Sequence, residues 1–404
     1  MRVLIAHDSA HAAGGVESYL ATIVRELAAR GHDLRTLHQS AAAQKPHWAP
    51  GLPSSCVEQL GLDRAVEGLR RWQPEVCYSH NMGALATERR LLDEWPVVKM
   101  MHGYFGTCIS GQKTHALPTT SACCRTFGPA CLPIYVARRC GGLSVPAVIG
   151  GYRWSVRQRA LFQRYRAIVV ASEHMRREYE RHGAEGARLH VLPLFSTLDS
   201  VDPRAPCGSA VLFAGRMTPL KGGHVLVAAL AHAAKRLGRP VPLLLAGDGP
   251  QRESWQRLAQ AAGVPALSTG WLGPDARGTV YSQAALLALP SLWPEPFGLV
   301  GLEAASLGIP AVAFDVGGVR EWLEPERSGV LVAPEDGSVG LGAAIAALMA
   351  DPGRLRALGD GARRVAARLS PGAHVDRLEH VLGEAVKSPH PGTSQASVIP
   401  ERTC

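Results

Sequence analysis

The sequence has no long hydrophobic run. No window of 18 residues is uninterruptedly apolar in the 404-residue chain, although 46% of its residues are hydrophobic, and a membrane-spanning helix needs about 20 such residues. The apolar runs are short, as in AIVVAS at 167–172 and ALLALP at 285–290, a length typical of buried strands. The first residues, MRVLIAHDS, are too short for a secretory signal and well shaped for a first strand. We therefore expect a cytoplasmic protein without a transmembrane helix.

Acidic side chains are outnumbered. Lys and Arg total 43 against 34 Asp and Glu, a net charge of +9, and this excess favours anionic partners. Aromatic residues are few, at 6%, and the basic residues lack the aromatic interleaving on which single-stranded nucleic acid stacks. We therefore expect no nucleic-acid partner, and favour an anionic substrate or a membrane surface.

A basic stretch lies between Arg153 and Arg181, in YRWSVRQRALFQRYR and HMRREYERHG. A cationic helix there could rest on anionic lipid, as a peripheral contact at the inner face of the membrane. Merely solvated helices are the alternative interpretation.

The chain repeats one pattern of elements in two halves. A length of 404 residues exceeds what one core usually spans. Each half alternates short apolar runs with helical stretches, the pattern of a parallel sheet covered on both faces. The sequence therefore predicts an α/β protein of two Rossmann-like, doubly wound domains that face each other across a cleft.

The predicted boundaries follow from composition. An amino-terminal domain covers residues 1–200 and contains a cysteine-rich insertion at about 104–145; STLDSVDPRAPCGS at 196–209 is typical of a linker. A carboxy-terminal domain covers 208–370 and is followed by a helix at 371–386. The last residues, 387–404, have no periodicity and are predicted to be disordered.

A helix start suited to anions is predicted in EPFGLVGLEAASLG at 295–308. Gly298 is unsuited to a helix interior, so the helix should begin near Leu299, with the amides of Gly298, Leu299 and Val300 free and pointing into the crevice. Free amides at a helix N-terminus bind phosphate.

Two carboxylates flank this helix start. Glu295 precedes it, and Glu303 lies four residues beyond Leu299 on the same side of the helix. Both would repel a bare phosphate, but carboxylates accept hydrogen bonds from sugar hydroxyls, which a nucleoside-diphosphate sugar carries on both sides of its diphosphate. The spacing favours Glu303 at the ribose and Glu295 at the transferred sugar. A loop acid and a solvated helix acid are the simpler alternative.

Two cations follow a predicted strand in FAGRMTPLKGG at 213–223. Arg216 lies directly after the strand, and Lys221 precedes the glycines that open the next helix. This arrangement presents both cations to an anion, although solvated cations at strand ends are common.

Together these segments resemble the nucleotide-binding half of the retaining glycosyltransferases with the GT-B architecture, the family 4 and group 1 type. The resemblance extends over about residues 210–334, in the family's order, and its motifs are Gly215–Arg216 with Lys221–Gly222, LLLAGDGP at 243–250, PFG between Glu295 and Glu303, and GIPAVAFDVGGVREWL at 308–323.

The resemblance implies a place for each part of the donor in the second half. Arg216 and Lys221 would hold the diphosphate, Glu303 the ribose and Glu295 the sugar. The base would lie near Trp271 and Leu272, against their backbone.

Two features of the first half would meet the same donor. Gly14 and Gly15 precede a helix after the first predicted strand, where glycines allow close approach of a ligand; a tight turn without a ligand is the alternative. His102 ends the predicted strand VVKMMH, and in the family a residue at this strand end touches the reacting face of the sugar. A structural or solvated histidine is the other interpretation.

No DxD-like pair appears at a strand end, so a Mg²⁺ clamp is not expected and fixed cations would neutralise the diphosphate. The resemblance implies a retaining, metal-independent hexosyltransferase that needs no cofactor and uses a UDP-, GDP- or ADP-sugar. Its acceptor would be a glycan, a lipid-linked compound or a small molecule. The alternatives are an inverting transferase, a nucleotide-sugar epimerase and a non-catalytic nucleotide-sugar-binding protein.

The cysteines of the insertion fall within 33 residues. Their clustering in a cytosolic chain favours thiolates over disulfides, but successive gaps of 15, 1, 7 and 9 lack the paired spacing of zinc sites. A structural metal and reduced cysteines in a loop-rich insertion on the acceptor side both stay open. The candidates are Cys108, Cys123, Cys124, Cys131 and Cys140.

Overall fold

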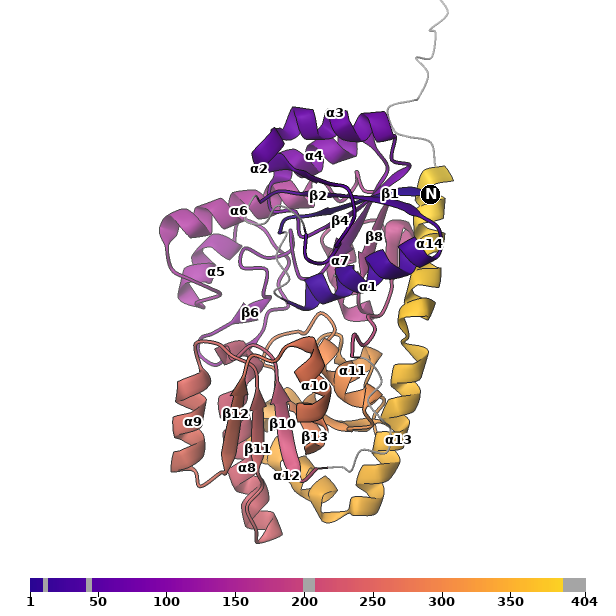
Figure 1. Cartoon of the computed structure of the whole chain (residues 1–404). Helices are drawn as coiled ribbons and strands as arrows, with labels where there is room; N and C mark the ends of the chain where they lie inside the picture. Colours follow the sequence, from indigo (N-terminus) through magenta and orange to yellow (C-terminus); the bar gives the residue numbers. More distant parts are fainter. Residues whose placement is uncertain (10–13, 41–45, 199–207, 388–404) are drawn as a thin grey trace, which may run out of the picture.

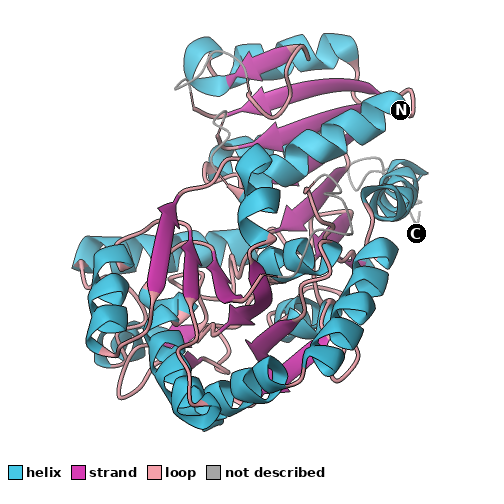
Figure 2. Ribbon diagram, turned by 60° about the horizontal axis from the view of Figure 1, so that its bottom comes forward, coloured by secondary structure: helices cyan, strands magenta, loops and turns pink. Residues whose placement is uncertain are grey.

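The computed structural model describes residues 1–9, 14–40, 46–198 and 208–387. Two lobes, each built on a parallel sheet, lie one above the other in Figure 1, and helices flank the strands of both sheets in Figure 2. The predicted fold of two Rossmann-like domains is therefore confirmed. Within the described ranges, no helix combines the length and apolar character needed to cross a membrane.

The first lobe has, over the described residues, a seven-stranded sheet in the order β3-β2-β1-β4-β5-β8-β9. Its interior strand β1 is buried from Val3 to Ala6, as expected for a strand covered by helices on both faces. The strands are β1 Arg2–His7, β2 Asp33–His38, β3 Ser54–Cys56, β4 Val76–His80, β5 Val97–Met101, β8 Ala167–Val170 and β9 Leu189–Val191. The helices are α1 Gly15–Ala29, α2 Val57–Leu60, α3 Leu62–Trp72, α4 Leu85–Glu94, α5 Cys131–Ala137, α6 Val145–Arg159 and α7 Glu173–Arg181, with a 3₁₀ turn at Gly186–Arg188.

The second lobe has a six-stranded sheet in the order β12-β11-β10-β13-β14-β15, again counted over described residues. The strands are β10 Ala210–Ala214, β11 Leu243–Ala246, β12 Ala266–Gly270, β13 Ala284–Leu289, β14 Ala311–Phe314 and β15 Gly329–Val332. The helices are α8 Gly223–Leu237, α9 Arg252–Ala261, α10 Pro274–Tyr281, α11 Leu299–Ser306, α12 Gly337–Ala350 and α13 Pro352–Arg368, with 3₁₀ turns at Pro219–Lys221, Val319–Glu321 and Pro334–Asp336.

Strand order places the ligand-binding edge of each sheet. In both sheets the first strand of the lobe, β1 or β10, lies between the second and the fourth, so the order reverses beside it. Ligands of open α/β sheets bind at the carboxyl ends of the strands at such a reversal. The loops after β1 and β10, which carry Gly14 and Arg216, therefore start at the two expected positions.

The last helix, α14 (Pro371–Lys387), returns to the first lobe and packs on α1, as the yellow ribbon of Figure 1 shows. The ring of His374 joins the two: its Nε2 accepts from the Tyr19 hydroxyl at 2.8 Å, and its Nδ1 donates to the Pro193 carbonyl at 2.8 Å. Burial lowers the pKa of His374 to about 4, so the ring is neutral and can play both roles. The predicted linker falls mostly on residues 199–207 and the predicted disordered tail on 388–404, outside the described residues.

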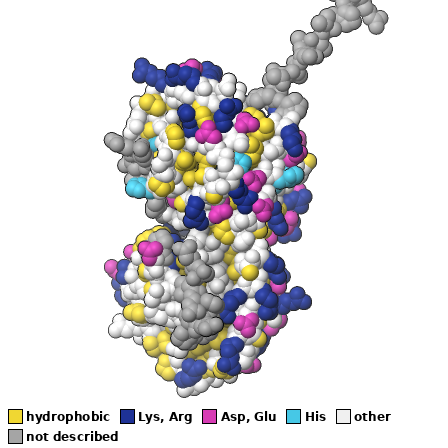
Figure 3. All heavy atoms as spheres, turned by 45° about the vertical axis from the view of Figure 1, so that its right-hand side comes forward, with side chains coloured by type: hydrophobic (Ala, Val, Ile, Leu, Met, Phe, Trp, Pro, Cys, Tyr) yellow, Lys and Arg dark blue, Asp and Glu magenta, His cyan; other side chains and the backbone are white. Residues whose placement is uncertain are grey.

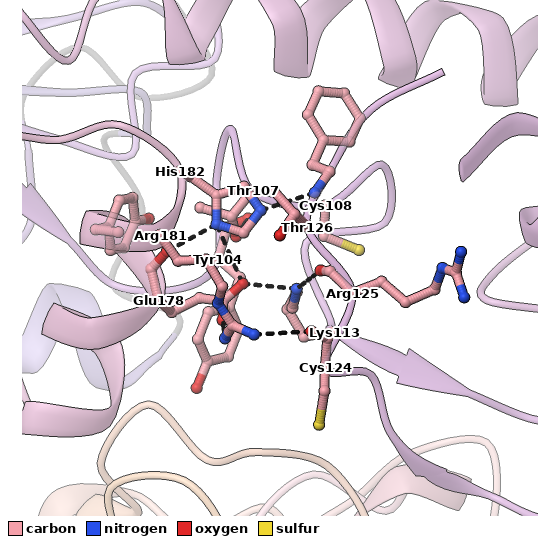
Figure 4. Close-up of polar contacts among 12 residues, drawn as sticks. Tyr104, Thr107, Cys108, Lys113, Cys124, Arg125, Thr126, Glu178, Arg181 and His182 are labelled. Atoms are coloured by element: carbon pink, nitrogen blue, oxygen red, sulfur yellow. Dashed lines mark hydrogen bonds and ion pairs between the residues drawn. The ribbon is translucent and has the colours of Figure 1, made fainter. Parts of the chain in front are cut away.

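The cysteine-rich insertion contains more regular structure than the expected loops. It has a short hairpin, β6 (Thr114–His115) with β7 (Ser121–Ala122), then α5 and the start of α6. A buried ion pair fastens it to α7, with Lys113 Nζ 2.6 Å from Glu178 Oε1. Figure 4 shows these two side chains pointing toward each other beside Arg181, which also bonds Glu178.

Candidate active site

A cavity of about 1290 Å³ lies between the lobes. It is lined by the loops after β1, β10 and β11, by the start of α11, by α10 and by the inner edge of the insertion. Pockets for drug-sized ligands are usually about 300–1,000 Å³, so this cleft has room for a ligand larger than a typical drug. A smaller hollow of about 680 Å³ at the other end of β10–β12 is lined by uncharged residues and offers no cation to an anion.

Glycines let the strand-end loops of the second lobe pack backbone against backbone. A side-chain carbon at Gly247 would lie 2.1 Å from the carbonyl oxygen of Gly215, and one at Gly249 would lie 2.6 Å from that of Met217. Both glycines also have positive φ, 138° and 149°, which other residues rarely adopt. The motif LLLAGDGP therefore brings the β11 loop against the β10 loop that carries Arg216.

The predicted helix start is present and opens into the cleft. Helix α11 begins at Leu299, Gly298 has a left-handed φ of 86°, and no side chain caps this end. Leu299 and Val300 line the cleft. The glycine loop of the first lobe faces them, because a side-chain carbon at Gly15 would lie 3.9 Å from Leu299 Cδ2. The free amides at the start of α11 therefore face the loop after β1 across the cleft.

The two predicted cations line this part of the cleft in different states. Arg216 is exposed and makes no ion pair with a described residue. Lys221 is held: its Nζ lies 2.7 Å from Glu295 Oε1 and 5.3 Å from the centre of the Trp293 ring. An incoming anion would meet one exposed, unpaired cation and one cation held by contacts with the protein.

Glu295 lies behind Lys221 and does not line the cavity. Its side chain is 3% exposed, and Ser291 donates to the same oxygen that Lys221 contacts. The other oxygen, Oε2, takes part in neither of these contacts. The loop is held from below, since Gly318 N donates to the Glu295 carbonyl at 2.7 Å and Trp322 Nε1 to the Phe297 carbonyl at 2.7 Å. The GGVREW motif thus supports the EPFG loop from a later part of the sequence.

Glu303 is placed on the cleft wall by α10. Arg277 Nη1 lies 2.7 Å from its Oε1, and the Tyr281 hydroxyl donates to its Oε2 at 3.2 Å. Burial raises the pKa of Glu303, and the charge of Arg277 opposes that rise. Arg277 and Tyr281 also line the cleft, although the sequence pattern did not single them out. Their contacts with Glu303 join two helices, and no local sequence motif predicts such contacts.

His102 lies at the end of β5, as expected, but beneath the cavity lining. Its Nε2 is 3.0 Å from Nδ1 of His80, the last residue of β4. Burial lowers the pKa of His102 to about 3 and that of His80 well below its usual value. Both rings are therefore neutral near pH 7, and one of them must donate its N–H to the other. No local sequence pattern distinguishes His80.

The structure brings most of the predicted residues to one cleft. Those at its lining are Gly14, Gly15, Arg216, Lys221, Trp271, Leu272, Leu299, Val300 and Glu303. Gly298 caps the helix behind them, while Glu295 and His102 lie one layer deeper. Trp293 is a further lining residue that the sequence pattern did not single out, although it lies two positions before Glu295.

The cysteines are not gathered into a metal site. Within the described residues, which include all five candidates, no group of three His, Cys, Asp or Glu side chains is arranged to hold a metal ion. Cys140 lines the cleft, with its Sγ 3.4 Å from His115 Nδ1, and Cys124 is exposed. Burial raises the pKa of Cys140 to about 11, so this thiol is protonated near pH 7 and is not the thiolate expected from the sequence.

Each lobe matches a known protein family. The model described as Glycosyltransferase Family 4 matches residues 13–196, and the one described as Glycosyl transferases group 1 matches residues 208–351.

Curated relatives match both lobes. The D-inositol 3-phosphate glycosyltransferase of Nocardia farcinica is 28% identical over 383 residues, covering 86% of this chain and 79% of that protein. That of Segniliparus rotundus is 36% identical over 230 residues, 52% of this chain and 49% of its own length, so the chain spans about half of that relative.

Solved structures share the architecture. Anabaena HepE, crystallised in complex with UDP and glucose, aligns over 95% of this chain and 99% of its own with a TM-score of 0.70 and 18% identity. A sucrose-phosphate synthase from Thermosynechococcus elongatus aligns over 95% of this chain and 99% of its own with a TM-score of 0.67 and 20% identity. At such identities the likeness concerns the fold.

Proposed function

This chain belongs to the glycosyltransferases of the GT-B fold, with a Family 4 half followed by a group 1 half, and from this premise we propose that it transfers a hexose from a nucleoside-diphosphate sugar to an acceptor hydroxyl. The observation that carries the proposal is the uncapped start of α11 in the cleft, flanked by Arg216 and Lys221 and facing Gly15. Backbone amides and two cations at one point suit a diphosphate.

The rest of the donor extends along the second lobe. With the diphosphate at Arg216, Lys221 and α11, the ribose hydroxyls reach Glu303, whose carboxylate is held by Arg277 and Tyr281. The base lies at the cleft wall formed by Trp271 and Leu272. A UDP-, GDP- or ADP-sugar fits this arrangement equally, because the described contacts select the diphosphate and ribose.

The proposed reaction retains the configuration of the sugar. The bond from the anomeric carbon to the β-phosphate oxygen breaks, and Arg216, Lys221 and the α11 amides stabilise the charge that develops on the leaving phosphate without a metal ion. The acceptor oxygen forms its bond on the same face and passes its proton to that phosphate oxygen. His102 and Glu295 Oε2 are proposed to hold hydroxyls of the transferred sugar.

The acceptor is proposed to lie against the first lobe. The inner edge of the insertion contributes Gln112, Thr114 and Arg139 to the cleft opposite the donor side. Polar groups and one cation suit a glycan, a small polyol or the head of a lipid-linked compound. The Nocardia relative is named for a phosphorylated inositol, and Arg139 would suit an acceptor phosphate.

A donor panel tests the function directly. We expect the folded protein to hydrolyse one of a set of UDP-, GDP- and ADP-sugars slowly, and to be stabilised against heat by the matching nucleoside diphosphate. Released nucleoside diphosphate and thermal melting measure these effects, and the anomer formed with an added acceptor reports retention or inversion. No hydrolysis and no stabilisation across the panel would contradict the proposal, and an inverted product would contradict the retaining mechanism alone.

Nucleotide affinity is expected to fall as the pH drops through the raised pKa of Glu303. Only the ionised carboxylate accepts hydrogen bonds from two ribose hydroxyls. Because burial raises the pKa of Glu303, the loss of nucleotide affinity should occur at a higher pH than it would for an exposed Glu. Arg277→Met removes the charge that opposes the shift and should move the midpoint higher still. Calorimetric titrations with the matching nucleoside diphosphate against pH would measure both.

Glu303→Gln separates this effect from titration of the nucleotide's own phosphates. That variant should bind the nucleoside diphosphate weakly at every pH, and its affinity should no longer fall as the pH drops through the Glu303 pKa. An identical pH profile in the wild type, R277M and E303Q proteins would show that Glu303 does not contact the ribose.

A further inference from the structure

One long segment of the first lobe is free of acidic residues. Between Glu94 and Glu173 the chain has ten Lys and Arg and no Asp or Glu, whereas the whole chain averages one acid for every twelve residues. This segment covers 78 residues, from Trp95 to Ser172, and includes the insertion and all of α6. On the face seen in Figure 3, by contrast, basic and acidic side chains are intermixed over both lobes.

The outer face of α6 carries an apolar row beside a cationic one. Val145, Ile149 and Val156 are 66%, 42% and 38% exposed, and at 100° per residue they lie within about 40° of one another around the helix. Arg153 and Arg157 are exposed on the adjoining side. The buried side of α6 holds other residues, Val148, Ser155 and Gln158 among them.

The neighbouring part of the insertion has the same character. Helices α5 and α6 contact each other and project from the side of the first lobe opposite α14 (Figure 1). This projection and the β6–β7 turn beside it contain six of the eleven large hydrophobic side chains that are exposed in the described part of the chain. Beyond the three on α6, they are Leu117, Val136 and Leu143.

The cations of the projection are not neutralised by the protein. Arg125, Arg138, Arg153 and Arg157 are exposed, and none forms an ion pair with a described residue. The α7 part of the basic stretch differs, because two of its arginines pair with acids of the same helix. Arg176 pairs with Glu173 and Glu180, and Arg181 pairs with Glu178, because acids at i−3 and i+4 follow the helix periodicity.

Contacts with α7 and with the residue after it hold the part of the insertion that leads into α5. Lys113 Nζ, buried, contacts Glu178 and donates to the Arg125 carbonyl at 2.5 Å. Arg181 donates to the Cys124 carbonyl at 2.7 Å, and His182 Nε2 accepts from Phe127 N at 2.8 Å. Figure 4 shows this set of contacts converging from α7 on the insertion.

We infer that the α5–α6 projection binds the surface of an anionic lipid bilayer, with the valine and isoleucine row at the headgroup boundary and Arg153 and Arg157 at lipid phosphates. A bilayer matches both rows at once. Nucleic acid would use the cations and leave the apolar row in water, and a second copy of this chain would oppose cation to cation. The opposite edge of the insertion lines the cleft, so docking would hold the acceptor side close to the membrane.

Vesicle sedimentation of the full chain tests this surface. We expect binding to phosphatidylcholine vesicles that contain phosphatidylglycerol, weaker binding in high salt, and none to phosphatidylcholine alone. R153Q/R157Q should lower the affinity about 20- to 30-fold, because each cation near an anionic surface contributes about a fivefold factor. V145S/I149S should remove the binding that persists in high salt.

Matched controls lie on the second lobe. K235Q/R236Q makes the same charge change at exposed positions, and L267S/V339S the same kind of apolar change; both should bind vesicles as the wild type does. The inference would be overturned if K235Q/R236Q lost as much vesicle affinity as R153Q/R157Q does. It would also be overturned if the wild type did not bind anionic vesicles in low salt. The inference would also be overturned if V145S/I149S bound vesicles as the wild type does and an oligonucleotide displaced the protein from them. That result would indicate a surface for polyanions in general.

The enzymatic proposal is tested separately in the same samples. R153Q/R157Q and V145S/I149S should retain donor hydrolysis in solution, since neither pair lines the cleft. Intact hydrolysis without vesicle binding by the wild type would overturn the membrane surface and leave the transferase. Vesicle binding without donor hydrolysis would support the membrane surface and contradict the proposed transferase activity.

Discussion

Replacing Arg216 with alanine is expected to lower kcat/KM for glycosyl transfer by on the order of 10²–10³, the usual cost of removing one preorganised stabiliser of developing charge. Arg216 is exposed at the carboxyl edge of β10 and has no ion pair with a described residue, so the variant should keep its thermal stability. Steady-state kinetics with saturating acceptor, together with a melting curve, would measure both.

Arg236→Ala is the matched control for this prediction. Arg236 is exposed in the last turn of α8, at the end remote from Lys221, and its loss changes the net charge equally. If R216A and R236A had the same kcat/KM, the leaving diphosphate would have to lie elsewhere.

Replacing Lys221 with methionine is expected to lower kcat by a similar factor and also to destabilise the fold. Glu295 is buried, and without Lys221 Nζ at 2.7 Å its carboxylate would keep only Ser291 as a described partner. Leaving a buried polar group with too few partners costs about 1–3 kcal/mol of unfolding free energy. Chemical denaturation and initial rates would measure the two effects.

A double variant separates the two consequences of that change. K221M/E295Q replaces the stranded charge by a neutral amide, so stability should largely return while kcat stays low. Lys235→Met, exposed in the last turn of α8, is the control for losing a lysine. Recovery of activity in the double variant would mean that Lys221 only neutralises Glu295 and does not contact the donor.

The local features of the site were predictable because short-range rules determine them. Gly298 could only cap a helix that begins at Leu299, and α11 begins there. The positions of Arg216 and Lys221 at a strand end followed from the apolar run of β10 before them. Each of these predictions needs only neighbours within about one helical turn of the residue concerned.

The partners of these residues were not predictable from such rules. Lys221 and Glu295 are 74 positions apart, and Arg277 meets Glu303 across 26. Such contacts depend on how α8, α10 and α11 stack on the sheet, which no local pattern encodes. The same reason applies to His80 beneath His102, which requires β4 and β5 to lie side by side.

The sequence by itself determined the repeated alternation of strands and helices, the helix start after EPFG, the basic strand end and the glycine loop, because backbone stereochemistry and hydrophobic periodicity act over a few residues. Only the tertiary structure decided which carboxylate holds which cation, that α14 closes on the first lobe, and that the α5–α6 projection presents unpaired arginines and valines outward. Those outcomes depend on burial and on contacts between distant segments, and both exist only once the sheets have formed and the lobes have packed.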